Sequence, residues 1–318
     1  MHSKSTRVLV TGASGFLGRN LIHFLQANGI DNCAVFRPES NLWRYRNFET
    51  SSVSAELNDS HFWEDYFLRN RITHIVHLAT YGSYPDQTDT QKTIATNLFS
   101  SLSFTQIAMQ SKNLVTFISA GSGSEYDPLK GVSSENDIGK SANIYGATKT
   151  AYGLVASRMA EDYGKNFAHL RLFTMYGPWE QPTRIIPRLL VHASNGTLPP
   201  LSDAKNARDY VYVNDVLTLF LKMITKNDSF NTTVNVGSGI STTLGSLVKD
   251  VKEIYNLSVN PQWGVFPSRT FDQKEWTCTV NLAEEIFGWH ASTSIKQGLL
   301  HYSEWLSGNK LNNYIIES

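Results

Sequence analysis

Short β-branched runs alternate along this chain with longer amphipathic stretches. Both kinds of segment occur up to about residue 173, where apolar runs alternate with helix-like spacing. The runs predict strands at Arg7–Val10, Cys33–Phe36, His74–Leu78, Leu114–Ser119 and Phe167–Phe173. The stretches between them predict helices at Leu17–Ala27, His61–Asn70, Gln91–Gln110 and Asn143–Tyr163. Such alternation indicates crossover units, and we therefore expect an α/β fold with a doubly wound parallel sheet covered on both faces.

The pattern loosens after about residue 175. Prolines and glycines interrupt this region, among them Gly177, Pro178 and Pro182. Helical spacing returns at Asn214–Thr225, Thr243–Tyr255, Leu282–Phe287 and Ile295–Leu306. A change in organisation near residue 175 is therefore expected.

Composition and charge exclude several classes of protein. The 318 residues carry 28 Lys and Arg against 28 Asp and Glu, a balance that argues against a nucleic-acid binder. No run of about 20 apolar residues occurs, and the N-terminus lacks an apolar signal core, so we expect a cytoplasmic protein with no membrane partner. Cys33 and Cys278 form no Cys-x-x-Cys pair, and the nine histidines form no ligand motif, so no metal site is predicted.

A glycine-rich segment follows the first predicted strand. Residues 10–18 read Val-Thr-Gly-Ala-Ser-Gly-Phe-Leu-Gly and lead into an apolar helix. Gly12 permits a tight turn, Gly15 lets the backbone approach a pyrophosphate, and Gly18 lets the helix pack on the strand. The free N–H groups of the helix N-terminus then face the phosphates. The residues expected to contact a dinucleotide here are Gly12, Ser14, Gly15, Phe16, Leu17 and Gly18.

The end of the second predicted strand bears on which dinucleotide is bound. A carboxylate at this place would bond the ribose hydroxyls of NAD, but the chain has Val35-Phe36-Arg37-Pro38. A guanidinium pairs well with a phosphate, so Arg37 favours NADP(H), with NAD(H) as the alternative. The other interpretation of Arg37 is a solvated loop residue.

Tyr145 and Lys149 lie four residues apart in a predicted helix and therefore share one face. A nearby ammonium lowers the pKa of a phenol, so that Tyr145 could exchange a proton with a carbonyl or alcohol oxygen. A serine at the end of the preceding strand could bond the same oxygen. Three serines compete for that place, Ser119, Ser122 and Ser124, and their spacing alone does not separate them.

Several motifs together resemble the extended short-chain dehydrogenase/reductases, and among them the nucleotide-sugar (NAD-dependent) epimerase/dehydratase family. The matching segments are Thr11–Gly18, His77–Thr80, Asn97, Ser122 with Tyr145-x-x-x-Lys149, Tyr176–Pro178 and Arg208–Val216. The resemblance implies a dinucleotide-binding Rossmann domain over residues 1–175, with later segments near 208–238 returning to it. It also implies a smaller, mostly substrate-binding C-terminal domain over residues 176–318. A homodimer formed through Gln91–Gln110 and Asn143–Tyr163 is expected by the same analogy.

The resemblance also assigns residues to roles. It selects Ser122, four residues before Tyr126, as the catalytic partner of Tyr145 and Lys149. It adds to the cofactor site Glu56, Leu57, Leu78, Ala79, Thr80 and Asn97, with Tyr145 and Lys149 also contacting the cofactor. It places on the nucleotide-sugar substrate the residues Thr174, Arg184, Arg208 and Arg269.

The family's dehydratases carry an acid soon after the catalytic serine, where this chain has Gly123 and Ser124, with Glu125 one place too late. Dehydration is therefore disfavoured. Together with Arg37, this predicts an NADP(H)-dependent reductase of a nucleotide-activated 4-keto-6-deoxy sugar. The alternative is a nucleotide-sugar C4 epimerase with a tightly bound coenzyme. A more remote alternative is a dinucleotide-binding protein without turnover.

Overall fold

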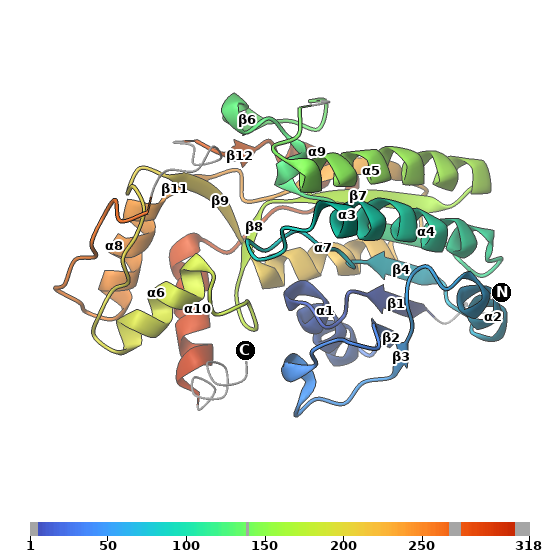
Figure 1. Ribbon diagram of the computed structural model, residues 1–318, viewed down its shortest axis with the longest axis horizontal. Coiled ribbons are helices and arrows are strands. Elements are labelled where there is room, and N and C mark those ends of the chain that lie inside the picture. Colours follow the sequence, from blue (N-terminus) through green and yellow to red (C-terminus); the bar gives the residue numbers. More distant parts are fainter. Residues whose placement is uncertain (1–5, 138–139, 267–274, 309–318) are drawn as a thin grey trace. The chain divides into compact units, whose positions relative to one another are not determined.

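The computed structural model in Figure 1 describes residues 6–137, 140–266 and 275–308. The described chain divides into two compact units. The first contains residues up to 127, 140–172 and 220–234, and the second contains 128–137, 173–219 and the described residues from 235 onward. Both units are therefore assembled from segments that are not contiguous in sequence.

A seven-stranded sheet forms the centre of the first unit, in the order β10-β7-β5-β4-β1-β2-β3. Its strands are β1 (Arg7–Thr11), β2 (Asp31–Phe36), β3 (Ser52–Ser54), β4 (His74–His77), β5 (Thr116–Ala120), β7 (Asn166–Leu172) and β10 (Asn231–Val236). The pairs from β7 to β3 are parallel, with Thr11 opposite His77 and His77 opposite Ser119. The predicted doubly wound parallel α/β fold is confirmed.

Helices α1 (Phe16–Ala27), α2 (Ser60–Arg69), α3 (Thr90–Ile94), α4 (Ser101–Gln110) and α5 (Ile144–Tyr163) pack around this sheet (Figure 1). Trp63 of α2, Phe104 of α4 and Tyr152 of α5 share one apolar core with Phe117 of β5. The chain moves in one direction from β1 to β2 and in the opposite direction from β3 through β4 to β5. Because crossover connections are right-handed, α1 lies on one face of the sheet, and the helices that follow β3 lie on the opposite face.

The reversal of strand order creates a topological switch point between β1 and β4. Open α/β sheets bind ligands outside the carboxyl ends of the strands at such a point. The glycine-rich turn follows β1, and residues Leu78–Thr80 follow β4. The fold therefore places both predicted cofactor segments at the edge where a ligand is expected.

The second unit contains smaller sheets and four further helices. One sheet has the order β11-β9-β8 and the other pairs β12 with β6. The strands are β6 (Val132–Ser133), β8 (Thr174–Tyr176), β9 (Ala207–Tyr212), β11 (Ser241–Thr243) and β12 (Thr277–Cys278). The helices are α6 (Ile185–Ser194), α8 (Leu244–Ile254), α9 (Asn281–Phe287) and α10 (Ile295–Ser307), while α7 (Val213–Thr225) begins in this unit and ends in the first.

Two of the helical segments differ from the predicted elements. The helix predicted over Gln91–Gln110 is interrupted, because Ala95–Ser100 between α3 and α4 is π-helical. Helix α6 was not predicted, since its sequence contains Pro187. This proline lies in the first turn, where a missing backbone N–H costs no intrahelical hydrogen bond.

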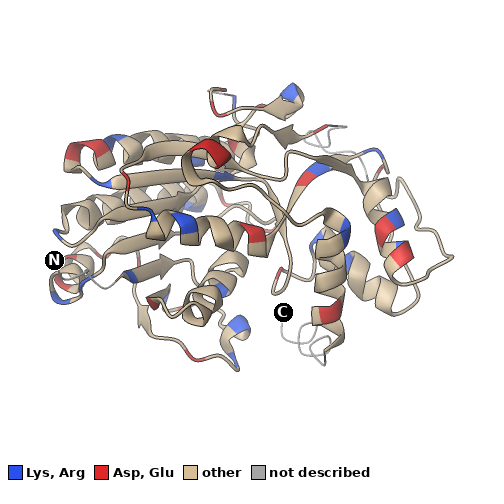
Figure 2. Cartoon of the chain, turned by 180° about the vertical axis from the view of Figure 1, so that it is seen from behind, with Lys and Arg blue, Asp and Glu red and all other residues tan. Residues whose placement is uncertain are grey.

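Figure 2 shows basic and acidic residue positions on the same helices. This agrees with the overall balance of 28 Lys and Arg against 28 Asp and Glu. Among the described residues, no helix is both long enough and apolar enough to cross a membrane.

Candidate active site

The glycine-rich turn has the geometry that a bound pyrophosphate requires. Gly12 adopts φ +66°, and a Cβ there would lie 2.6 Å from the backbone nitrogen of Ala79. A Cβ at Gly18 would lie 2.5 Å from the carbonyl oxygen of Gly12, so the helix can approach the turn only with glycine at this position. Gly15 caps α1 without a side chain, which leaves backbone N–H groups of the first turn for a ligand. These residues fit a dinucleotide phosphate.

A short 3-10 segment, Trp43–Tyr45, holds the outside of this turn. The Tyr45 hydroxyl donates to the carbonyl oxygen of Ala13 at 3.0 Å, and Nη1 of Arg44 donates to that of Ser14 at 3.2 Å. Arg19 of α1 in turn donates from Nε to the carbonyl oxygen of Arg44 at 2.9 Å. Sequence patterns did not reveal this segment, because a single 3-10 turn has no periodicity of its own.

Arg37 lies directly after β2 and is exposed. Its backbone N–H donates to Oγ of Ser40 at 3.0 Å, while its guanidinium has no hydrogen bond or ion pair within the described part of the chain. Glu56, predicted to contact adenine, is also exposed, whereas Leu57 beside it is buried. The guanidinium is thus free to bind an anion.

The segment after β4 is tied to the glycine-rich turn and to α5. The backbone N–H of Leu78 donates to the carbonyl oxygen of Thr11, and that of Ala79 donates to Oγ1 of Thr11. The Asn97 amide accepts from Thr80 and from the Tyr81 backbone, and donates to the Tyr81 carbonyl and to Thr148. All four hydrogen-bonding positions of Asn97 are used. Asn97 therefore positions this loop against α5.

The three residues predicted to be catalytic lie close together in the first unit. The Tyr145 side chain forms hydrogen bonds with Ser122 and Thr80. The ammonium nitrogen of Lys149 lies 5.9 Å from the centre of the Tyr145 ring and donates to the carbonyl oxygen of Ala120 at 2.9 Å. Asn143 caps α5 through its side chain and thereby fixes the helix end that carries Tyr145. The arrangement brings a phenol, a hydroxyl and an ammonium together.

The pKa of Tyr145 is raised, whereas the sequence predicted that a nearby ammonium would lower it. Burial raises it to about 12, while the hydrogen bonds from Thr80 and Ser122 lower it and the charge of Glu125 raises it. Burial also lowers the pKa of Lys149 to about 8, against the opposing effect of Glu125. Desolvation is the largest cause for both groups, since each is buried where its charged form is poorly hydrated.

The structure separates the three candidate serines. Ser119 is fully buried, and its Oγ lies 2.8 Å from Nδ1 of His169. Ser124 uses its carbonyl oxygen to accept from the Ala142 backbone. Only Ser122 of the three has a side-chain hydrogen bond to Tyr145 in the described residues.

Glu125 lies in a buried ion-pair network. Its carboxylate accepts from Nε2 of His169 and from Nε of Arg171, each at 3.0 Å. Burial opposes ionisation, but the charge and hydrogen bond of His169, the charge of Arg171 and the Ser122 backbone together hold the pKa of Glu125 below its usual range. A carboxylate in this state has no proton to give. The structure thus supplies a second reason to disfavour dehydration.

The predicted substrate residues that can be described lie in the second unit. Thr174 of β8 is opposite Tyr210 of β9. Burial raises the pKa of Tyr210 to about 12. The positive charges of Arg208 and Arg184 oppose this and lower it in part. The Arg208 guanidinium also stacks 4.7 Å from the Trp276 ring centre. Arg269 lies outside the described residues.

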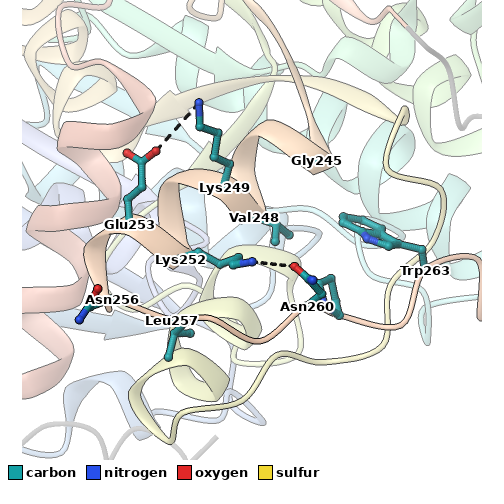
Figure 3. A pocket seen from close by; sticks show the side chains of 10 residues that line it. Gly245, Val248, Lys249, Lys252, Glu253, Asn256, Leu257, Asn260 and Trp263 are labelled. Carbon is teal, nitrogen blue, oxygen red and sulfur yellow. Dashed lines mark hydrogen bonds and ion pairs between the residues drawn. The ribbon is translucent and has the colours of Figure 1, made fainter.

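A separate surface cavity of about 440 Å³ occurs in the second unit (Figure 3). It is lined by α8 and the following segment up to Trp263. Lys249 pairs with Glu253 at 4.0 Å, and Nζ of Lys252 donates to Oδ1 of Asn260 at 2.6 Å. None of the predicted site residues lines this cavity. In the described ranges no cluster of three His, Cys, Asp or Glu side chains could hold a metal ion.

Comparison with known families settles the membership that the motifs suggested. Residues 8–237 match the model of the NAD dependent epimerase/dehydratase family. The chain belongs to this family. The glycine-rich turn, Tyr145 and Lys149 all lie within the matched residues, and the predicted resemblance is confirmed.

Family relatives cover nearly the whole chain. A UDP-glucuronate 4-epimerase 6 of Arabidopsis thaliana is 25% identical over 95% of this chain and 71% of its own length. The crystal structure of UDP-glucose 4-epimerase with UDP-glucose from Thermotoga maritima is 26% identical, covers 95% of this chain and 98% of its own, and has a TM-score of 0.85. MoeE5 in complex with UDP-glucuronic acid and NAD is 26% identical with a TM-score of 0.79, and covers 94% and 98%.

Proposed function

We propose that this family member is a UDP-sugar 4-epimerase that keeps its coenzyme through the catalytic cycle. One observation carries the proposal: Ser122, Tyr145 and Lys149 are gathered together in the first unit, and Glu125, the acid that follows the serine, is held ionised and has no proton to give for dehydration. Similarity to two UDP-sugar 4-epimerases over 95% of this chain supports it. The epimerase was the second interpretation of the sequence, and these relatives favour it over the reductase.

The residues divide the work as follows. Tyr145 takes the proton of the C4 hydroxyl and later returns it to the same oxygen. Ser122 donates a hydrogen bond to that oxygen and so stabilises the charge that develops on it. Lys149 supplies a positive charge beside the phenolate. A dinucleotide held at the glycine-rich turn would supply an acceptor for the C4 hydride of the sugar and, once reduced, a donor of that hydride to the opposite face of C4.

Tyr145 must lose its own proton before it can take one from the sugar. A phenol with a pKa of about 12 is almost wholly protonated at neutral pH. The positive charge of an oxidised nicotinamide would favour the phenolate, so deprotonation is expected only in the complex that is ready to oxidise the sugar. Deprotonation of Tyr145 therefore depends on an oxidised coenzyme being bound in the site.

Binding of the substrate diphosphate is proposed for Arg208, with Arg184 as a further contact to the nucleotide sugar, and the charges of both arginines act on Tyr210. The assignment rests on the family resemblance and on the chemistry of guanidinium groups. Exchange of each arginine for methionine should raise KM for the UDP-sugar without changing coenzyme binding.

The experiment incubates the purified protein with UDP-glucose or UDP-glucuronate, without added coenzyme, and follows the C4 epimers by NMR. Interconversion is the expected result. Consumption of one NADPH per molecule of a nucleotide-linked keto sugar, with no interconversion, would establish the reductase instead. That second candidate is retained because the exposed Arg37 guanidinium is free to bind the 2′-phosphate of NADP(H).

A further inference from the structure

We propose that Glu125 is a positioning residue: its carboxylate, held between His169 and Arg171, fixes the backbone of Ser122 so that the serine hydroxyl faces Tyr145. The inference rests on the proposed function only in that Ser122 and Tyr145 act on the substrate oxygen, which holds equally for the epimerase and the reductase. Glu125 itself touches neither substrate nor cofactor in this scheme.

The contacts of Glu125 connect the serine to the sheet. Oε1 accepts from the backbone N–H of Ser122 at 2.8 Å and from Nε2 of His169 at 3.0 Å, while Oε2 accepts from Nε of Arg171 at 3.0 Å. The Ser122 hydroxyl oxygen also accepts from the Ser124 backbone at 3.1 Å. Serine and glutamate thus form a reciprocal capping box over the turn Gly123–Glu125.

Both partners of the carboxylate are anchored on strand β7. His169 is paired in register with Ser119 of β5, and its Nδ1 lies 2.8 Å from the Ser119 hydroxyl. Arg171 also donates from Nη1 to the Tyr126 hydroxyl at 2.9 Å. The carboxylate is therefore hydrogen-bonded to β7 directly and linked to β5 through His169. The Ser122 backbone N–H is in turn hydrogen-bonded to the carboxylate.

Glycines at three neighbouring positions leave the space that this network occupies. A Cβ at Gly121 would lie 2.4 Å from Oε1 of Glu125, and a Cβ at Gly153 would lie 2.7 Å from Cδ2 of His169. On α5, a Cβ at Gly146 would lie 1.9 Å from the Ser124 carbonyl oxygen. The turn, the histidine and the helix that carries Tyr145 therefore approach one another more closely than side chains would allow.

A nucleophilic role for this cluster is excluded by its burial. Ser119, His169 and Glu125 are connected in the order of a hydrolase triad, but Ser119 is fully buried and His169 is 1% exposed. No substrate reaches that hydroxyl. A buried ion pair is also a weak source of stability, because desolvation offsets much of its attraction. Orientation of the turn is the role left for the carboxylate.

The test is a double-mutant cycle on Glu125 and Ser122. Glu125→Gln keeps the shape of the side chain but places an amide against the N–H groups of His169 and Arg171. We expect kcat to fall about 10-fold or more, with KM changed less than about 2-fold, because one positioned hydrogen bond is lost. On a Ser122→Ala background the same change should cost less than about 2-fold, since the residues act as a unit. Equal losses on both backgrounds, or no loss in wild type, would overturn the inference.

Controls separate positioning from charge and from folding. Glu161→Gln removes an exposed carboxylate on α5 that pairs with Arg158, and should leave kcat unchanged. Thermal unfolding checks that each variant is folded. If Glu125→Gln does not fold, Arg171→Lys replaces it in the cycle, because it keeps the positive charge and loses the Nε hydrogen bond to Glu125.

A second measurement does not depend on the reaction. Amide hydrogen exchange in the peptide that spans Ser122 should be slow in the wild type and at least about 10-fold faster in the glutamine variant, because the acceptor of that N–H is disturbed. Absence of the effect overturns the inference. Absence of epimerisation in the wild type, with the exchange effect present, contradicts only the proposed function, and the cycle is then measured with keto sugar and NADPH.

Discussion

The ammonium nitrogen of Lys149 lies 5.9 Å from the ring centre of Tyr145, one helical turn away on α5, and is bonded to the carbonyl oxygen of Ala120. Strand β5 therefore holds the lysine, and the helix holds the tyrosine. Because Lys149 is 3% exposed, its position is fixed by packing as well as by this hydrogen bond. The two groups that the chemistry needs are placed before any ligand arrives.

Replacement of Tyr145 by phenylalanine should abolish turnover and leave coenzyme binding intact. General acid–base catalysis contributes roughly 100- to 10,000-fold to a rate, and the phenol is the group proposed to move the proton. Epimerisation is measured by NMR, and NADP+ and NAD+ affinity by calorimetry. Tyr163→Phe, which removes an exposed hydroxyl at the end of the same helix, is the matched control. A Tyr145→Phe variant with unchanged turnover would contradict the mechanism.

Arg37 should set the preference between coenzymes. We expect the wild type to bind NADP+ more tightly than NAD+, and Arg37→Asp to weaken NADP+ binding by about 10- to 100-fold, since a charge-assisted hydrogen bond to the 2′-phosphate is lost. The same substitution should not weaken NAD+ binding, because aspartate can bond the ribose hydroxyls. Both affinities are measured on protein stripped of coenzyme.

Arg69→Ala is the control for the loss of one positive charge, because Arg69 is an exposed residue of α2 paired with Asp65. A wild type that binds NAD+ more tightly than NADP+ would contradict the prediction. That outcome would agree with the NAD-bound relative and would make Arg37 a solvated loop residue.

The sequence predicted the sheet and the tight glycine-rich turn well, because both follow from local rules. Buried parallel strands form continuous apolar runs, and Gly12 and Gly18 are glycines for reasons of local space. It could not predict the role of Glu125, whose partners His169 and Arg171 lie more than 40 residues away. Nor could it predict the pKa of Tyr145, since burial of a side chain depends on the folded environment. Long-range contacts, rather than local pattern, carry the missing information.

Acid should destabilise the first unit through two buried histidines. Burial lowers the pKa of His77 to about 3 and that of His74 to about 4. The folded protein thus binds fewer protons than the unfolded chain below the ordinary histidine pKa of about 6.5. The stabilising effect is complete above pH 6.5 and is lost as the pH falls toward these values. For His77 alone the loss is roughly 2 kcal/mol between pH 6.5 and pH 5.

Denaturant unfolding at a series of pH values checks this. His77→Gln keeps polar contacts to Thr11 and Ser101 but cannot titrate, so the free energy of unfolding should fall less steeply with acid. His61→Gln, at an exposed position of α2, should leave the slope unchanged. A slope that is the same for His77→Gln and the wild type would show that this imidazole is not the group responsible.

The exposed apolar side chains near α4 and α5 should be covered by a second copy of the chain. Leu154 is 61% exposed and Val155 is 41% exposed on α5, and Phe99 just before α4 is 66% exposed. Exposed leucine and phenylalanine on neighbouring helices indicate a contact surface, and the family resemblance implies a homodimer through these helices. Leu154→Glu would bury two like charges at a two-fold interface and should therefore yield a monomer.

Light scattering after gel filtration measures the mass of each variant. Leu68→Glu, at an 84% exposed position of α2, is the control and should remain dimeric. A monomeric wild type, or a dimeric Leu154→Glu variant, would contradict the assignment of this surface.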